Sequence, residues 1–128
     1  MAFIDRSKSK MKRFLHSFIY AWNGIITTAK KEVNFRIHLL ASVCVIAFGI
    51  FFQINVFEWI VILLLIGGIL SLELMNTAIE RIVDMVTQKY HPLAKMAKDA
   101  GAGAVFIYAI ISVIIGLLIF IPKMNIWQ

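Results

Sequence analysis

Residues 59–84 read WIVILLLIGGILSLELMNTAIERIVD, and this stretch decides what kind of fold the chain can adopt. Its first 14 residues carry no charge, whereas Glu73, Asn76, Glu80 and Asp84 follow at helical spacing. A helix that crosses a bilayer needs about 20 mainly apolar residues. The stretch is therefore predicted to cross a membrane as a helix that carries acidic side chains into the bilayer.

Two further charge-free runs flank this stretch. Residues 39–57 supply 19 residues without a charge, and residues 100–122 supply 23. We therefore predict three transmembrane helices, at 38–56, 59–80 and 100–121. A short turn near 53–58 would join the first two. A cytoplasmic loop at 81–99, which contains the helix-breaking pair His91-Pro92, would join the last two.

Composition supports a single integral membrane domain and excludes other classes. Of the 128 residues, 61% are hydrophobic and 16% are charged, whereas soluble domains are typically about half apolar and about a quarter charged. Cys44 is the only cysteine, which excludes a disulfide-rich secreted module. The sequence contains no phosphate-binding glycine loop and no Cys/His metal pattern.

The basic residues are unevenly distributed along the chain. Eight of the 13 lie within residues 1–36, four within 81–98, and only Lys123 lies near the C-terminus. Basic residues favour the cytoplasmic side of membrane loops. The N-terminus and the loop 81–99 are therefore expected in the cytoplasm, and the C-terminus outside. Because this topology accounts for the positive charge, nucleic acid is not expected as a partner.

Residues 1–36 are predicted to form a basic amphipathic helix. Apolar side chains recur at intervals of three and one from Met11 to Ala29, and basic side chains occupy the opposite face. Such a helix typically lies in the membrane interface. A calmodulin-type target helix and a core helix of a soluble domain are alternatives, and the spans that follow disfavour both.

The polar stripe, which we define as Glu73, Asn76, Thr77, Glu80 and Asp84, falls within a sector of about 100° on a helical wheel. Glu73 would lie about 10 Å, or two turns, deeper in the bilayer than Glu80. An acid at such a depth costs about 2.5–3.5 kcal/mol and is a candidate for function. The alternative is a structural polar network that holds helices together.

Two more charged clusters are expected at the same membrane level. Glu32 and Arg36 precede the first span, and Lys98 and Asp99 precede the third. Each pair alone could be a surface ion pair or a helix cap. Together, acids in a basic setting suit Mg²⁺ and a polyphosphate, and the deeper acid suits a general base. The pattern favours phosphoryl transfer to an alcohol in the membrane.

The sequence Glu73-Leu-Met-Asn-Thr-Ala-Ile-Glu80, with Val83-Asp84 and Ala97-Lys-Asp-Ala-Gly101, resembles the prokaryotic diacylglycerol kinase/undecaprenol kinase family. The resemblance extends over nearly the whole chain. It implies a small all-α lipid kinase of the bacterial cell membrane that works as a homotrimer with sites shared between protomers. It also implies ATP as the phosphate donor, Mg²⁺ as the cofactor and an active site at the cytoplasmic face.

The resemblance also assigns roles to individual residues. Glu73 would be the catalytic base and Asn76 its polar partner, while Glu32 and Glu80 would hold Mg²⁺. The residues expected to contact the metal–nucleotide complex are Arg13, Tyr20, Glu32, Glu80, Lys89, Tyr90, His91, Lys98 and Asp99. The departures from the family pattern are Thr77 in place of a serine, and Val33-Asn34 beside Glu32.

The expected reaction is the ATP-dependent phosphorylation of undecaprenol to undecaprenyl phosphate. Phosphorylation of diacylglycerol to phosphatidic acid is the alternative. A protein of another class, such as a non-enzymatic ion or proton conductor or a membrane assembly partner, could also use membrane-embedded acids. A conductor needs acids spaced across the membrane, whereas these acids gather at one face.

Overall fold

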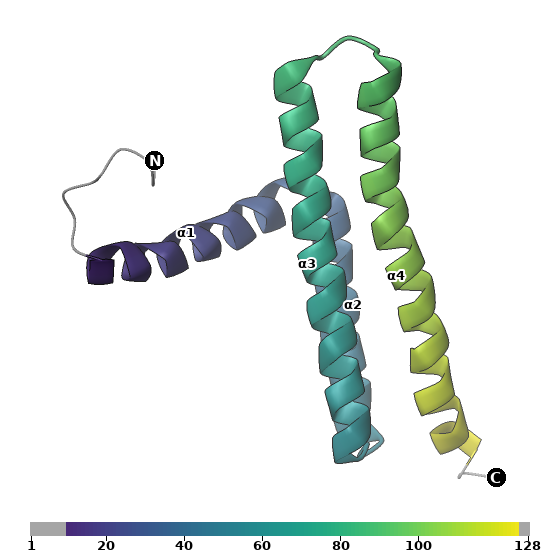
Figure 1. Cartoon of the computed structure of the whole chain (residues 1–128). Helices are drawn as coiled ribbons and strands as arrows, with labels where there is room; N and C mark the ends of the chain where they lie inside the picture. Colours follow the sequence, from purple (N-terminus) through teal and green to yellow (C-terminus); the bar gives the residue numbers. More distant parts are fainter. Residues whose placement is uncertain (1–9, 126–128) are drawn as a thin grey trace.

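Each long apolar run folds into a continuous helix in the computed structural model, which describes residues 10–125 (Figure 1). The elements are α1 (Lys10–Lys31), α2 (Val33–Phe51), α3 (Val56–Val86) and α4 (Pro92–Met124). By length and composition, α2, α3 and α4 can each cross a membrane. The prediction of an all-helical chain with three apolar spans is therefore confirmed for the described residues.

The amphipathic segment forms α1, a separate helix that leaves the other three sideways (Figure 1). The sequence predicts a helix over 1–36; the structure has α1 at 10–31, and residues 1–9 lie outside the described part. Glu32 interrupts the helix with extended backbone angles (φ −105°, ψ 117°). The Arg36 guanidinium donates a hydrogen bond to the Lys30 carbonyl at 3.0 Å, which satisfies an acceptor at the end of α1.

The turn between α2 and α3 lies earlier than the predicted bounds, because α2 already ends at Phe51. A capping box then fixes the start of α3 at Val56. The Glu58 amide donates to the Asn55 side chain, and the Asn55 amide donates to the Glu58 carboxylate, both at 2.9 Å. Gln53 adopts a left-handed conformation (φ 49°) that closes the turn.

The predicted loop 81–99 is mostly helical, and only residues 87–91 lie outside helices. Polar residues mark the edge of the bilayer, but they do not end a helix. The break occurs at His91, whose Nδ1 accepts a hydrogen bond from the Leu93 amide, with Pro92 opening α4. The 31 residues of α3 and 33 of α4 span about 46 and 50 Å, so the α3–α4 hairpin extends beyond a hydrocarbon core of about 30 Å.

The middle position belongs to α3, which packs against both α2 and α4. Phe35 of α2 and Ile62 of α3 are the two large side chains that are fully buried among the described residues. Gly68 allows close approach on the α4 side, where the Tyr108 hydroxyl donates to the Leu64 carbonyl at 2.9 Å. The Tyr108 side chain therefore joins α4 to the backbone of α3.

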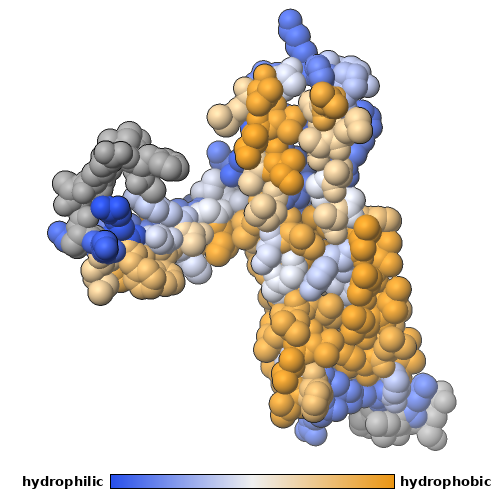
Figure 2. Space-filling model, in the orientation of Figure 1, coloured by the Kyte–Doolittle hydropathy of each residue, from blue (hydrophilic) through white to orange (hydrophobic). Residues whose placement is uncertain are grey.

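The outward faces of the three long helices are apolar (Figure 2). Leu40, Leu63 and Leu118, one on each helix, are all more than half exposed. A water-soluble protein would bury such side chains, whereas a bilayer solvates them. At the end opposite to the 87–91 turn, Lys123 Nζ lies 3.0 Å from Glu58 Oε2, so the 52–55 turn and the end of α4 share one side.

Gly68→Ala should destabilise the packing of α3 on α4. A Cβ at position 68 would lie 1.9 Å from the Tyr108 hydroxyl oxygen, so the ring must move and its bond to Leu64 is lost. We expect a loss of about 1–3 kcal/mol in the free energy of unfolding, measured by thermal or denaturant unfolding in detergent. Gly67→Ala is the matched control, because no atom lies within 4 Å of its Cβ position. Equal losses in both variants would contradict this packing.

Candidate active site

The inner part of the polar stripe, formed by Glu73, Asn76 and Thr77, lies inside the helix bundle, whereas Asp84 at its outer end is exposed. Glu73 is 4% exposed, Asn76 8% and Thr77 4%. Met75 and Ile82, on the other side of α3, are both 61% exposed. The orientation predicted from the helical wheel is therefore correct for these three residues. It places a carboxylate and a carboxamide in an enclosed setting at membrane depth.

Glu73 contacts a side chain that the sequence analysis did not select. His38 Nε2 of α2 lies 3.3 Å from Glu73 Oε1, and the two side chains are 23% and 5% exposed. One feature of the sequence could have drawn attention to His38, namely that it is a titratable residue directly before the charge-free run 39–57. Its partner, however, lies on another helix, and helical periodicity does not predict contacts between helices.

Asn76 links the deep part of the stripe to its outer part. Its Nδ2 donates to Glu80 Oε1 at 3.1 Å, whereas its Oδ1 is buried without a hydrogen-bond partner in the described residues. Gly101 of α4 faces this oxygen, and a Cβ there would lie 2.5 Å from it. Leaving a buried acceptor unpaired costs about 1–3 kcal/mol, so the close packing of α4 on Asn76 is obtained at the expense of this oxygen's hydrogen bond.

Ion pairs join the helices at the outer part of the stripe. Arg81 Nη2 lies 3.6 Å from Glu32 Oε1, and Lys98 Nζ lies 2.6 Å from Asp84 Oδ1. A third pair, Lys95 with Asp99, lies along α4. Lys98 and Asp99 were predicted to contact nucleotide, and Arg81 and Lys95 were not selected. Such exposed pairs contribute little to stability, so a polyphosphate can replace them at little cost.

The structure brings only some of the predicted nucleotide-binding residues together. Lys89, Tyr90 and His91 lie in or beside the 87–91 turn and are exposed, with His91 capping α4. Arg13 and Tyr20 lie on α1, which packs on α2 and α3, whereas the 87–91 turn lies at the far end of the α3–α4 hairpin, away from α1 (Figure 1). Within one chain these two groups of residues do not meet.

The acidic residues suit a metal ion that binds together with substrate phosphates better than one held by protein side chains alone. Among residues 10–125 no group of three or more His, Cys, Asp or Glu side chains is close enough to hold an ion. Glu80 and Glu32 nevertheless each present a carboxylate near the same membrane level, paired with Asn76 and Arg81 respectively. Mg²⁺ is commonly held by one or two carboxylates plus substrate phosphates, and this donor set fits that mode.

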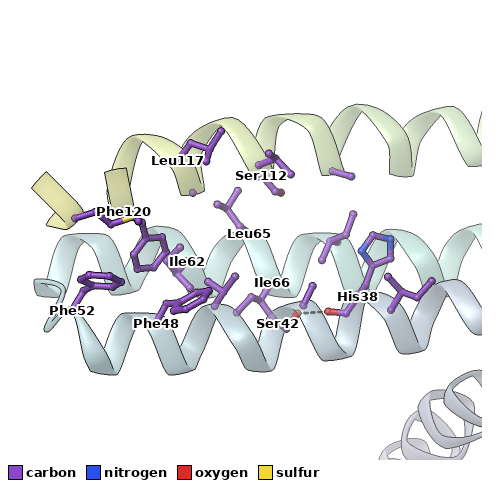
Figure 3. Close-up of a pocket in the computed structure, with 18 residues that line it drawn as sticks. His38, Ser42, Phe48, Phe52, Ile62, Leu65, Ile66, Ser112, Leu117 and Phe120 are labelled. Atoms are coloured by element: carbon purple, nitrogen blue, oxygen red, sulfur yellow. Dashed lines mark hydrogen bonds between the residues drawn. The ribbon is translucent and has the colours of Figure 1, made fainter. Parts of the chain in front are cut away.

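An apolar groove of about 610 Å³ runs along the bundle between α2, α3 and α4 (Figure 3). Phe48, Phe52 and Phe120 line it toward the 52–55 turn, where their rings contact one another. His38 lies at the opposite end, beside Glu73. The groove therefore leads along the apolar part of the molecule to His38, whose ring contacts the buried Glu73 carboxylate.

Comparisons with known proteins find relatives that match most of the chain. The family model described as prokaryotic diacylglycerol kinase matches residues 19–120. An undecaprenol kinase of Bacillus subtilis is 53% identical over 91% of this chain and 95% of its own. A diacylglycerol kinase of Synechocystis is 41% identical over 86% of this chain and 63% of its own. The Escherichia coli K12 diacylglycerol kinase is 28% identical over 80% and 84%.

Gly101→Ala should disturb the site more than the fold. The new methyl group would collide with Asn76 Oδ1, and the carboxamide would turn away from Glu80. A displacement of about 1 Å can cost about 10²-fold in rate, so we expect phosphate transfer to lipid to fall between about 10- and 100-fold. Gly103→Ala is the control, because its Cβ position has no atom within 4 Å. Wild-type turnover in Gly101→Ala would show that Asn76 need not keep this position.

Proposed function

This chain belongs to the prokaryotic diacylglycerol kinase family, and we propose that it transfers the γ-phosphate of ATP to undecaprenol, giving undecaprenyl phosphate. The observation that carries the proposal is the Glu73 carboxylate, enclosed at membrane depth beside the end of the apolar groove. The similarity to an undecaprenol kinase favours a polyprenol over diacylglycerol. Membership of a kinase family sets aside the alternative of a non-enzymatic conductor.

The apolar groove supports a lipid alcohol as the acceptor. A polyprenol is a long apolar chain with a single hydroxyl at one end. The apolar lining of the groove suits such a chain. His38, which contacts Glu73, lies at the polar end of the groove (Figure 3). A small water-soluble alcohol would enter this apolar environment only at a cost in desolvation.

We assign the role of general base to Glu73. An alcohol is a weak nucleophile, and attack on a γ-phosphate benefits from proton removal and from tight positioning. Glu73 would accept the hydroxyl proton as the oxygen bonds to phosphorus and the bond to the leaving nucleoside diphosphate breaks. Asn76 would be the polar partner of Glu73 one turn further along α3, where its Nδ2 donates to Glu80 Oε1.

Nucleotide and metal binding are assigned to the outer part of the stripe. Glu80 and Glu32 would hold Mg²⁺ together with the phosphates. When bound, the ion neutralises negative charge on the phosphates. Lys98 and Asp99 would leave their exposed ion pairs to contact the nucleotide, and the 89–91 segment would contact it from the turn. All of these residues would face the cytoplasm, as the distribution of basic residues predicts.

A homotrimer would complete this site. In one chain, α1 keeps Arg13 and Tyr20 away from the 87–91 turn (Figure 1). These two residues would meet the 89–91 segment if α1 of one protomer approached the hairpin of another. The outward apolar faces of α2, α3 and α4 provide the surface for such an assembly within the bilayer.

The substrate is tested by offering two lipids to the same preparation. The purified protein in detergent micelles is given labelled ATP with undecaprenol and diacylglycerol in equal amounts, and the phosphorylated lipids are separated. We expect undecaprenyl phosphate as the main product. Phosphatidic acid as the main product would overturn the choice of acceptor, and no labelled lipid from either would overturn the proposed activity.

Glu73→Gln should abolish base catalysis while leaving nucleotide binding in place. Glutamine keeps the shape of the side chain but accepts no proton at its amide. General-base catalysis contributes about 10²–10⁴-fold, so we expect kcat to fall by about that factor. Measuring kcat and ATP-analogue affinity on one preparation separates the two effects. An unchanged kcat, or an equal loss of affinity, would contradict the assignment.

Glu32→Gln and Glu80→Gln should each raise the Mg²⁺ concentration that half-saturates the reaction. Each change removes an anionic oxygen ligand from a hard cation, so we expect a shift of about tenfold or more, read from activity titrated with Mg²⁺ at fixed ATP. Glu58→Gln is the matched control, because Glu58 lies at the opposite end of α3 and pairs with Lys123. Near-normal Mg²⁺ dependence in both site variants would remove these two residues from the metal assignment.

A further inference from the structure

We propose that His38 is a positioning residue for the Glu73 carboxylate. The inference rests on the proposed function, in which Glu73 accepts the proton of the lipid hydroxyl. In this arrangement the imidazole donates from Nε2–H to Glu73 Oε1, which leaves Oε2 directed at the substrate. His38 acts through Glu73 and does not itself touch the reacting atoms.

The need for such a residue follows from burial. The Glu73 side chain is 5% exposed, so water cannot hold its orientation. In the described part of the chain, the His38 imidazole is the one charged or titratable group within ion-pair distance of Glu73. A buried carboxylate without a donor is costly. The 3.3 Å approach of His38 Nε2 to Glu73 Oε1 supplies a donor within reach, and catalytic hydrogen bonds often tighten only when the substrate binds.

The neighbouring cations are engaged elsewhere. The Arg36 guanidinium, two residues before His38, donates to the Lys30 carbonyl at the end of α1. Arg81 pairs with Glu32, and Lys98 pairs with Asp84. An imidazole N–H can donate a hydrogen bond that orients a carboxylate, and these cations are not placed to do so. The chemistry of the site thus favours histidine at this position.

The placement of His38 is itself well defined. It lies in the second turn of α2, where its backbone carbonyl accepts a hydrogen bond from the Ser42 hydroxyl at 2.7 Å (Figure 3). The ring stands at the end of the apolar groove and reaches across to α3. A substrate hydroxyl that arrived along the groove would therefore meet Glu73 with its orientation already set.

The test compares His38→Leu, which removes the donor but keeps the apolar volume, with His38→Gln, which keeps a donor on a flexible side chain. Both are made in the full-length protein. We measure kcat, the KM for undecaprenol, the KM for MgATP and the melting temperature. A misplaced base can cost about 10²-fold, so His38→Leu should lose about 10- to 100-fold in kcat with an unchanged KM for MgATP. His38→Gln should stay within about fivefold of the wild type.

Cys44→Ala is the matched control on the same helix. Its side chain is exposed and does not line the groove, so we expect wild-type kinetics. If His38→Leu does not fold, His38→Met replaces it, because a thioether also lacks a donor. A wild-type kcat in the apolar variant overturns the proposal, as does a loss in His38→Gln as large as that in the apolar variant.

A double-mutant cycle separates positioning from a purely structural role. If His38 acts through Glu73, then adding His38→Leu to Glu73→Gln should cause no further loss of kcat. A structural contact between α2 and α3 would cost the same factor in both backgrounds, and that result overturns the proposal. If Glu73→Gln alone keeps wild-type turnover, the base assignment in the proposed function fails. If only Glu73→Gln loses turnover, the His38 proposal alone fails.

Discussion

A carboxylate placed inside the bilayer constrains the rest of this structure. Lipid cannot solvate Glu73, and an exposed charge at this depth costs about 2.5–3.5 kcal/mol. The three long helices are arranged so that this cost is avoided. The inner part of the polar stripe of α3 faces the bundle, and α2 supplies His38 beside the carboxylate. On α4, Gly101 lies against Asn76, where a larger residue would not fit. The outer faces that meet lipid carry exposed apolar side chains such as Met75 and Phe106.

The outer part of the polar stripe is exposed and held by ion pairs, whereas the inner part is buried and held by packing. Inside the bundle, Glu73 and Asn76 are enclosed, so their positions are held by packing and by few polar contacts. Toward the 87–91 turn, the charges form exposed pairs between and along helices, such as Lys98 with Asp84. Such pairs are weak and can be exchanged for contacts to a polyphosphate. A deep rigid base and an adaptable charged rim suit a reaction between a membrane lipid and a soluble nucleotide.

Hydropathy and periodicity predict a large part of this architecture. The three apolar runs become α2, α3 and α4, and the helical wheel predicts which face of α3 is buried. The helix ends were wrong by several residues, because charge marks the limit of the bilayer while capping residues and proline mark the limits of helices. Residues 81–86 and 92–99 are charged but helical.

The contacts between helices could not be read from one sequence. His38 and Glu73 lie far apart along the chain, and neither propensity nor periodicity links them. Gly101 has the same limitation, because its importance depends on the side chain that faces it. The family resemblance selected Glu73, Asn76 and Glu80 from their shared motif. It did not select the residues that hold them in place, since packing across the bundle decides those.

The central claim is that the lipid hydroxyl meets Glu73 inside the bundle. A polyprenol with a photoreactive group beside its hydroxyl tests this directly. After irradiation in the presence of an ATP analogue, the cross-linked peptides are identified by mass spectrometry. The account predicts labelling of α2 near His38 and of α3 near Glu73. Labelling confined to the outward face of α3, at Met75 and Ile82, would contradict it.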